Sequence, residues 1–212
     1  GRGHALSKSA VGYAGLVQLM RETDLPLQVS RTMEGRNGVV SLEVFTPEFE
    51  TPVLEIENGD KEPETREGLG GDKLVPSIYS GTVLVVLPKW RTEPDGSGQD
   101  RVRKVGPIAL SSYADDLRAL PGTAALTRDA GTAEVRLRGV SAPFLGRSFA
   151  VGRMEGLQTV SGKGVFPLIV DQRGRAVLAE LQREEGEAGE SEAYILSDPD
   201  LFNNMGLKSL ER

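Results

Sequence analysis

The chain has no cysteine and only one histidine, His4, among its 212 residues. Without cysteine there is no disulfide, no thiolate zinc site, no iron–sulfur cluster and no cysteine nucleophile. A lone histidine beside the N-terminus also argues against Ser-His-Asp catalysis and against metal sites built from several histidines. These absences exclude more function classes than any motif in the chain supports.

Long apolar runs and basic blocks are scarce as well. No apolar run approaches the roughly 20 residues that a helix needs to cross a bilayer, so we expect no membrane-spanning segment within the chain. The net charge is −6, and the densest basic stretch is RVRK at 101–104. Such a charge balance disfavours nucleic acid as a partner, because phosphate backbones are bound by basic surfaces.

The length suits one well-buried core, and we predict a single domain over residues 1–212. The chain begins GRGHALSKS without an initiator methionine, so we interpret it as a part excised from a longer protein. Residues 48–80 show weak patterning, and we interpret them as loop rather than as a second domain.

Two segments carry the clearest periodicity. Tyr13, Val17 and their apolar neighbours at helical spacing predict a helix over residues 9–22. The run from Val83 to Leu87 is continuously apolar and β-branched, which is typical of a central strand covered on both faces. Such a strand implies helices on both sides of a sheet.

The second half of the chain is rich in strand patterns. We predict a capped short helix over 111–120, and loops over 92–100 and 144–156. A final helix is expected from Pro199 onward, with Asp198 as its N-cap. Strands are predicted at 27–31, 39–47, 132–140, LQTVSG, FPLIVD, RAVLAEL and AYILS, with QRG as a tight turn between FPLIVD and RAVLAEL.

The stretch SDPDLFNN gathers short polar side chains directly after the strand AYIL. One interpretation places these side chains at the carboxyl end of a parallel strand, where open α/β sheets bind ligands. The other makes Asp198 a helix N-cap, Asp200 a favourable charge on the helix dipole, and the asparagines an anchor for a neighbouring loop. The candidate residues are Ser197, Asp198, Asp200, Asn203 and Asn204.

A calcium or magnesium site could use Asp198 and Asp200, because hard cations prefer oxygen ligands. The stretch lacks the glycine and the terminal glutamate of an EF-hand loop, so we assign no metal and no cofactor.

Two other places could contact a ligand or partner. Ser7 and Ser9 precede the predicted N-terminal helix, where they either help to bind an anion or only cap the helix. Lys89 and Trp90 follow the central strand, where they either dock a partner or belong to the core. A binding site becomes the stronger interpretation if the N-terminal and C-terminal motifs meet in space.

Several blocks together resemble the bacterial family catalogued as domain of unknown function 4350. These blocks are ALSKSAVGYAGLVQLM, LVVLPKW, LQTVSG, FPLIVD, GRAVLAEL and SDPDLFNNMGL. The resemblance implies a membrane-anchored protein whose soluble, extracytoplasmic part works with a membrane protein complex, together with a MoxR-type ATPase system. It also implies a class I glutamine-amidotransferase-like fold, although that chemistry needs the cysteine that this chain lacks.

We therefore expect a three-layer, flavodoxin-like α/β domain with a mostly parallel sheet and β-rich additions. The expected function is a non-catalytic binding or assembly module of a membrane-associated complex, with no catalytic residue. The alternative is a small-ligand sensor, or a metal-dependent or carboxylate-dependent enzyme, that uses the turn formed by Ser197, Asp198 and Asp200.

Overall fold

The computed structural model describes residues 13, 14, 17, 42–47, 82–94, 96, 102–118, 120, 123–182 and 192–202. Within this part of the chain, strands dominate and the longest helix is α3, with five residues. The elements are β1 (Glu43–Phe45), β2 (Val83–Val86), β3 (Trp90–Pro94), β4 (Val102–Pro107), η1 (Leu110–Tyr113), α3 (Ala114–Arg118), β5 (Thr123–Arg128), β6 (Thr132–Gly139), β7 (Ser148–Glu155), β8 (Gln158–Lys163), β9 (Val165–Asp171), β10 (Ala176–Leu181), β11 (Ala193–Leu196) and η2 (Pro199–Leu201).

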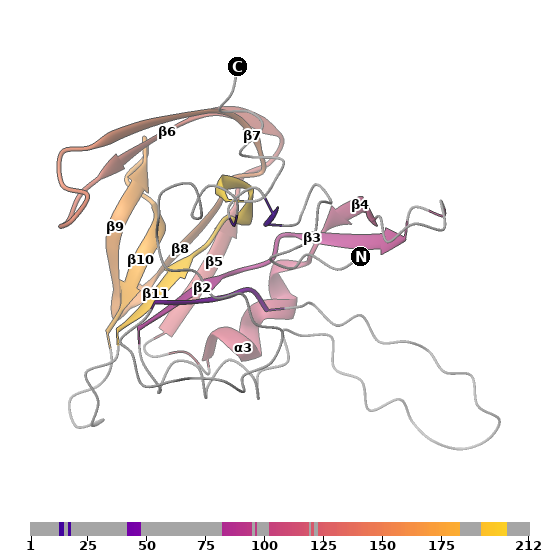
Figure 1. Cartoon of the computed structure of the whole chain (residues 1–212), viewed down its shortest axis with the longest axis horizontal. Helices are drawn as coiled ribbons and strands as arrows, with labels where there is room; N and C mark the ends of the chain where they lie inside the picture. Colours follow the sequence, from indigo (N-terminus) through magenta and orange to yellow (C-terminus); the bar gives the residue numbers. More distant parts are fainter. Residues whose placement is uncertain are drawn as a thin grey trace.

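Nine strands form one curled, mixed sheet (Figure 1). Its order is β1-β2-β11-β10-β9-β6-β7, and β8 branches from β10 and carries β5. Only the β1–β2 and β2–β11 pairings are parallel, and the other pairings of this sheet are antiparallel. Strands β3 and β4 form a separate two-stranded hairpin.

The expected three-layer flavodoxin-like or class I glutamine-amidotransferase-like α/β fold, with its mostly parallel sheet, is wrong. Parallel neighbours need crossover connections of a dozen or more residues, usually a helix, whereas antiparallel strands need only a tight turn. The antiparallel neighbours β9 and β10 are joined by such a turn at the predicted Gln172–Gly174, where the Gly174 amide donates to the Asp171 carbonyl. Parallel pairing is confined to three strands.

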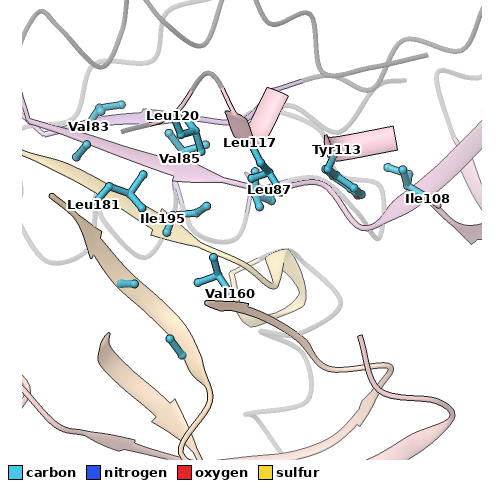
Figure 2. Packing of buried hydrophobic residues seen from close by; sticks show 13 residues of the cluster. Val83, Val85, Leu87, Ile108, Tyr113, Leu117, Leu120, Val160, Leu181 and Ile195 are labelled. Atoms are coloured by element: carbon cyan, nitrogen blue, oxygen red, sulfur yellow. The ribbon is translucent and has the colours of Figure 1, made fainter. Parts of the chain in front are cut away.

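Strand β2 is buried on both faces, as its apolar run predicted. Alternate side chains point to opposite sides of a strand, so Val83 and Val85 enter one apolar cluster and Val86 enters another. Figure 2 shows the first cluster, where Leu117 of α3 and Tyr113 of η1 pack against the strands. The second cluster contains residues of β6 and β7 instead of a helix pair, so the expectation of helices on both sides is corrected.

The remaining predictions had different outcomes. Strands β1, β6, β10 and β11 confirm the expected strands within their predicted ranges, and β8 and β9 confirm theirs with one residue more at one end. Strand β7 occupies the range predicted as a loop at 144–156, and β3, β4 and β5 were not predicted. The 111–120 helix exists as η1 and α3, but its N-cap is Ala109, which makes no side-chain cap. The predicted strand at 27–31 and the loop at 48–80 lie outside the described residues.

Both predicted terminal helices are only partly described. Ala14 and Val17 are helical, and the Val17 amide donates to the Tyr13 carbonyl at 3.0 Å. The C-terminal helix is a short 3-10 turn, η2, over Pro199–Leu201. The rest of both predicted helices lies outside the described residues.

Strands β8 and β11 meet end to end along one edge of β10. Leu178 of β10 pairs with Leu196, the last residue of β11, and Ala176 pairs with Val160 of β8. The turn at Ser197 and Asp198 therefore lies at the junction between the parallel and the antiparallel parts of the sheet. This junction is where the candidate site is built.

Candidate functional site

The site lies at the carboxyl ends of two adjacent parallel strands. Val86 of β2 pairs with Leu196 of β11, and the Leu87 amide donates to the Leu196 carbonyl at 3.0 Å. Both chains leave the sheet at the same edge, so the residues that follow them come together. This position was predicted for a ligand site of an open sheet.

Lys89 is the centre of the site and is 1% exposed. Its ammonium donates to Asp198 Oδ2 at 2.7 Å and to Asp200 Oδ2 at 2.9 Å. The side chain of Asp198 is fully buried, and that of Asp200 is 5% exposed. We call these three residues the ion cluster.

Asp198 serves both the cluster and the backbone. As the N-cap of η2 it accepts from the Asp200 amide at 3.0 Å through Oδ1. Its other oxygen, Oδ2, accepts from the Gln158 backbone amide at 2.9 Å as well as from Lys89. Burial raises the pKa of Asp198 to about 6, although the neighbouring Lys89 opposes the rise. The predicted capping role of Asp198 is therefore confirmed.

Asp200 is held from the side by the only tryptophan of the chain. Trp90 Nε1 donates to Asp200 Oδ1 at 2.9 Å, and the indole is 8% exposed. Lys104 of β4 covers the ring, with its Nζ 3.4 Å from the ring centroid, and also pairs with Glu155 of β7 at 2.7 Å. The β3–β4 hairpin is thereby tied to β7 across the indole.

A second polar chain leads from the ion cluster toward the surface. Ser197 Oγ donates to the Gln158 carbonyl at 2.7 Å, and Gln158 Nε2 donates to the Ser197 carbonyl at 2.6 Å. Gln158 Oε1 accepts from Arg128 Nη2 at 2.6 Å, and Arg128 Nη1 donates to the Ile108 carbonyl at 2.7 Å. These bonds join β5, β8 and β11 at one point.

Tyr13 packs on the same side of the sheet as Leu196 and is 6% exposed. Burial raises the pKa of its hydroxyl, and the charges of Asp200 and Asp198 raise it further. Tyr13 therefore lies close enough to the ion cluster to feel the charges of its two carboxylates.

The structure brings together five of the predicted site residues: Lys89, Trp90, Ser197, Asp198 and Asp200. The other four, Ser7, Ser9, Asn203 and Asn204, lie outside the described residues.

Sequence reasoning missed Gln158, Arg128 and Tyr13 as members of this network. Gln158 gave a usable signal, because it is the one long polar side chain at the start of an otherwise apolar or small strand segment. Arg128 gave none.

The charged groups of the site bind one another, which leaves little room for a substrate or a cation. The Lys89 ammonium lies between the two carboxylates at hydrogen-bond distance, in the place that an added cation would occupy. Within the described ranges, no three His, Cys, Asp or Glu side chains are gathered as metal ligands would be.

No helix in the described part of the chain is both long and apolar enough to cross a membrane.

A separate cavity of about 440 Å³ lies against β8 and the turn before β10. Three of its polar lining residues are paired: Thr127 Oγ1 and Thr159 Oγ1 are 2.7 Å apart, and Arg175 binds Asp129 and Asp171 at 2.6 Å each. The Arg175 guanidinium holds the pKa of Asp129 below its usual range. These contacts fasten the β9–β10 turn to the loop after β5.

Comparison with known protein families, curated proteins and solved structures found no match to this chain.

Proposed function

We propose that this chain is a non-catalytic binding or assembly module of a membrane-associated complex. The observation that carries the proposal is the internal saturation of the ion cluster. Lys89, Asp198 and Asp200 bind one another, two backbone amides and the Trp90 indole inside the protein. The side chains best suited to catalysis or to ion binding are therefore engaged in holding strand ends together.

A catalytic or sensing role for the same residues would require this cluster to open. Removing one partner of a buried ion pair leaves an uncompensated charge and typically costs about 3–5 kcal/mol. A substrate or cation would have to displace the Lys89 ammonium from two carboxylates that water does not reach. This cost favours the binding module over the sensor or the carboxylate-based enzyme.

The membrane part of the proposal rests on the resemblance to the domain of unknown function 4350 family. That resemblance implies a membrane anchor in the full-length protein, an extracytoplasmic position and a MoxR-type ATPase system nearby. Under this proposal the described domain contributes a docking surface, and the anchor keeps that surface close to the partner complex.

The proposal can be tested on the full-length protein in its native membranes. After mild detergent extraction, we expect native electrophoresis to show the protein in an assembly larger than its own mass. The Asp200→Asn variant, provided that it folds, should stay in this assembly. It should show no loss of turnover relative to the wild type on a broad panel of hydrolase substrates. Turnover on a broad hydrolase panel that disappears in this variant would overturn the proposal, and so would migration of the wild type as a free protein.

A further inference from the structure

The outer face of β6 and β7 carries three arginines, and a fourth exposed arginine lies in the loop just before β7, although the chain as a whole has a net charge of −6. Along β6 the buried side chains Val135 and Leu137 alternate with the exposed Arg136 and Arg138. The two strands curve over one end of the sheet, far from α3 (Figure 1). We call the exposed residues Arg136, Arg138, Arg147 and Arg153 the arginine face.

These arginines have no acidic partner among the described residues. Other arginines of this part of the chain do have acidic partners, as Arg175 has in Asp129 and Asp171 and Arg103 has in Glu93. On β7 the residues opposite Arg136 and Arg138 are Ala150 and Ser148. Small side chains there leave both guanidinium groups accessible from the outside.

A structured loop holds Arg138 and Arg147 close together. The Gly139 amide donates to the Arg147 carbonyl at 2.8 Å, and the Gly146 amide donates to the Gly139 carbonyl at 3.3 Å. A side chain at Gly139 would run into the Phe144 carbonyl, so the loop fits only against glycine. The loop presents Leu145, which is 70% exposed, beside the arginines.

We propose that the arginine face binds an extended acidic segment of a partner protein. Arg136 and Arg138 are two residues apart on one strand, so they are separated by about 7 Å, which matches alternate side chains of an extended chain. The guanidinium fork binds a carboxylate through two parallel hydrogen bonds. Leu145 adds an apolar contact at the end of the face. This proposal rests on the proposed function and identifies the partner surface.

An acidic segment fits this face better than an anionic lipid surface does. Glu134 lies on the same exposed face, directly opposite Arg153, and a flat layer of headgroups would meet that carboxylate. A polypeptide can place a neutral or basic residue against Glu134 and acids against the arginines. Lipid headgroups also recognise mainly positive charge, whereas the fork of arginine provides directional pairing.

The first test measures binding of a fluorescent peptide of about ten residues in which Glu alternates with Thr. We expect the Arg136→Glu/Arg138→Glu variant to lose about tenfold or more in affinity. The matched control Arg91→Glu/Arg103→Glu has the same net charge and alters exposed arginines of the β3–β4 hairpin, so it should lose about threefold at most. Arg136→Lys/Arg138→Lys keeps the charge without the fork and should fall between wild type and the Glu variant.

The proposal would be overturned if the protein bound vesicles of phosphatidylserine and phosphatidylcholine and showed no preference for the alternating peptide over these vesicles. Equal loss in the control and in the Arg136→Glu/Arg138→Glu variant would overturn it as well, because the effect would then come from net charge alone. A peptide with its glutamates grouped at one end serves as the composition control, and it should bind more weakly than the alternating peptide.

A second measurement separates this proposal from the proposed function. Native electrophoresis of the full-length protein should show a large assembly for wild type, and loss of that assembly for Arg136→Glu/Arg138→Glu. If the variant keeps the assembly, the arginine face is not the docking surface while the assembly role stands. If wild type forms no assembly, the proposed function itself fails.

Discussion

At the scale of single residues, Lys89 dominates the energetics of the candidate site. A buried ammonium is tolerated only when its charge is paired and its protons are bonded, and here two carboxylates pair the charge and each accept a hydrogen bond from it. Buried ion pairs contribute little net stability relative to apolar packing, but they strongly penalise the wrong arrangement. We infer that the ion cluster specifies which strand ends meet.

Asp198 gives the protein a pH-dependent stability. Its folded pKa of about 6 lies above the unfolded value of about 3.9, so the folded state binds the proton more tightly. The stability that this group contributes is therefore fully present below about pH 4 and is lost as the pH rises through about 6.

Urea unfolding at a series of pH values tests this expectation against Asp198→Asn, which cannot titrate there. The stability of wild type relative to the variant should fall between about pH 4 and about pH 6. Parallel profiles for the two proteins would show that Asp198 keeps an ordinary pKa.

Trp90→Phe keeps the aromatic packing but removes the indole N–H that binds Asp200. Leaving that buried carboxylate without this donor should cost about 1–3 kcal/mol. Tyr194→Phe is the matched control, because it removes a donor to a carboxylate at the surface, Glu192. Chemical denaturation followed by circular dichroism measures both, and equal losses would contradict a special role for the buried bond.

At the scale of elements, the junction of β8 and β11 is the distinctive feature. Both strands continue along the same edge of β10, and Gln158 and Ser197 exchange hydrogen bonds at their meeting point. Among the described strands, β5 pairs with the sheet through β8 alone. A substitution that destabilises β8 should therefore detach β5 from the sheet and weaken the Gln158 contacts that support the ion cluster.

Gly162→Ala tests the β5–β8 pairing. Gly162 has φ +145°, and an added side chain would collide with the Thr123 carbonyl of the neighbouring strand. We expect a loss of about 2 kcal/mol or more. Hydrogen exchange should show β5 amides losing protection first. Gly106→Ala, where an added methyl group meets nothing, is the control and should change stability by less than about 1 kcal/mol.

The sequence allowed the short elements to be predicted better than their arrangement. Short strand-like segments bounded by turn signals identified β6, β8, β9, β10 and β11, and the apolar run identified β2 as a strand buried on both faces. The arrangement was wrong because a single strand pattern does not reveal whether its neighbour runs parallel or antiparallel. Strand β7 was missed because its glycines and arginines are typical of loops.

For the candidate site too, single residues could be predicted from the sequence but their arrangement could not. Asp198 was predicted as a cap, and Lys89 was placed at the end of the central strand, but nothing in the sequence joined the two. They are 109 positions apart, and only the parallel pairing of β2 with β11 brings them together. Arg128 could not be predicted, because its link to Gln158 depends on the branching of β8.

At the scale of the whole molecule, the charges are divided between a buried cluster and an exposed face. The charges of the ion cluster are paired with one another, whereas the guanidinium groups of the arginine face have no acidic partner within the described residues of this acidic chain. Under our proposal the interior ions serve the architecture and the surface ions serve recognition. This division is the physical basis of the proposed assembly role.

The most direct measurement of this account is the unfolding free energy of Lys89→Met at two pH values. We expect a loss of about 3–5 kcal/mol at about pH 7.5, because two carboxylates stay buried without a counter-ion. The loss should shrink markedly at about pH 5, where protonation of Asp198 relieves the repulsion. Lys163→Met, at an exposed position of β8, should change little. A Lys89→Met protein as stable as wild type at both pH values would contradict the structural role of the ion cluster.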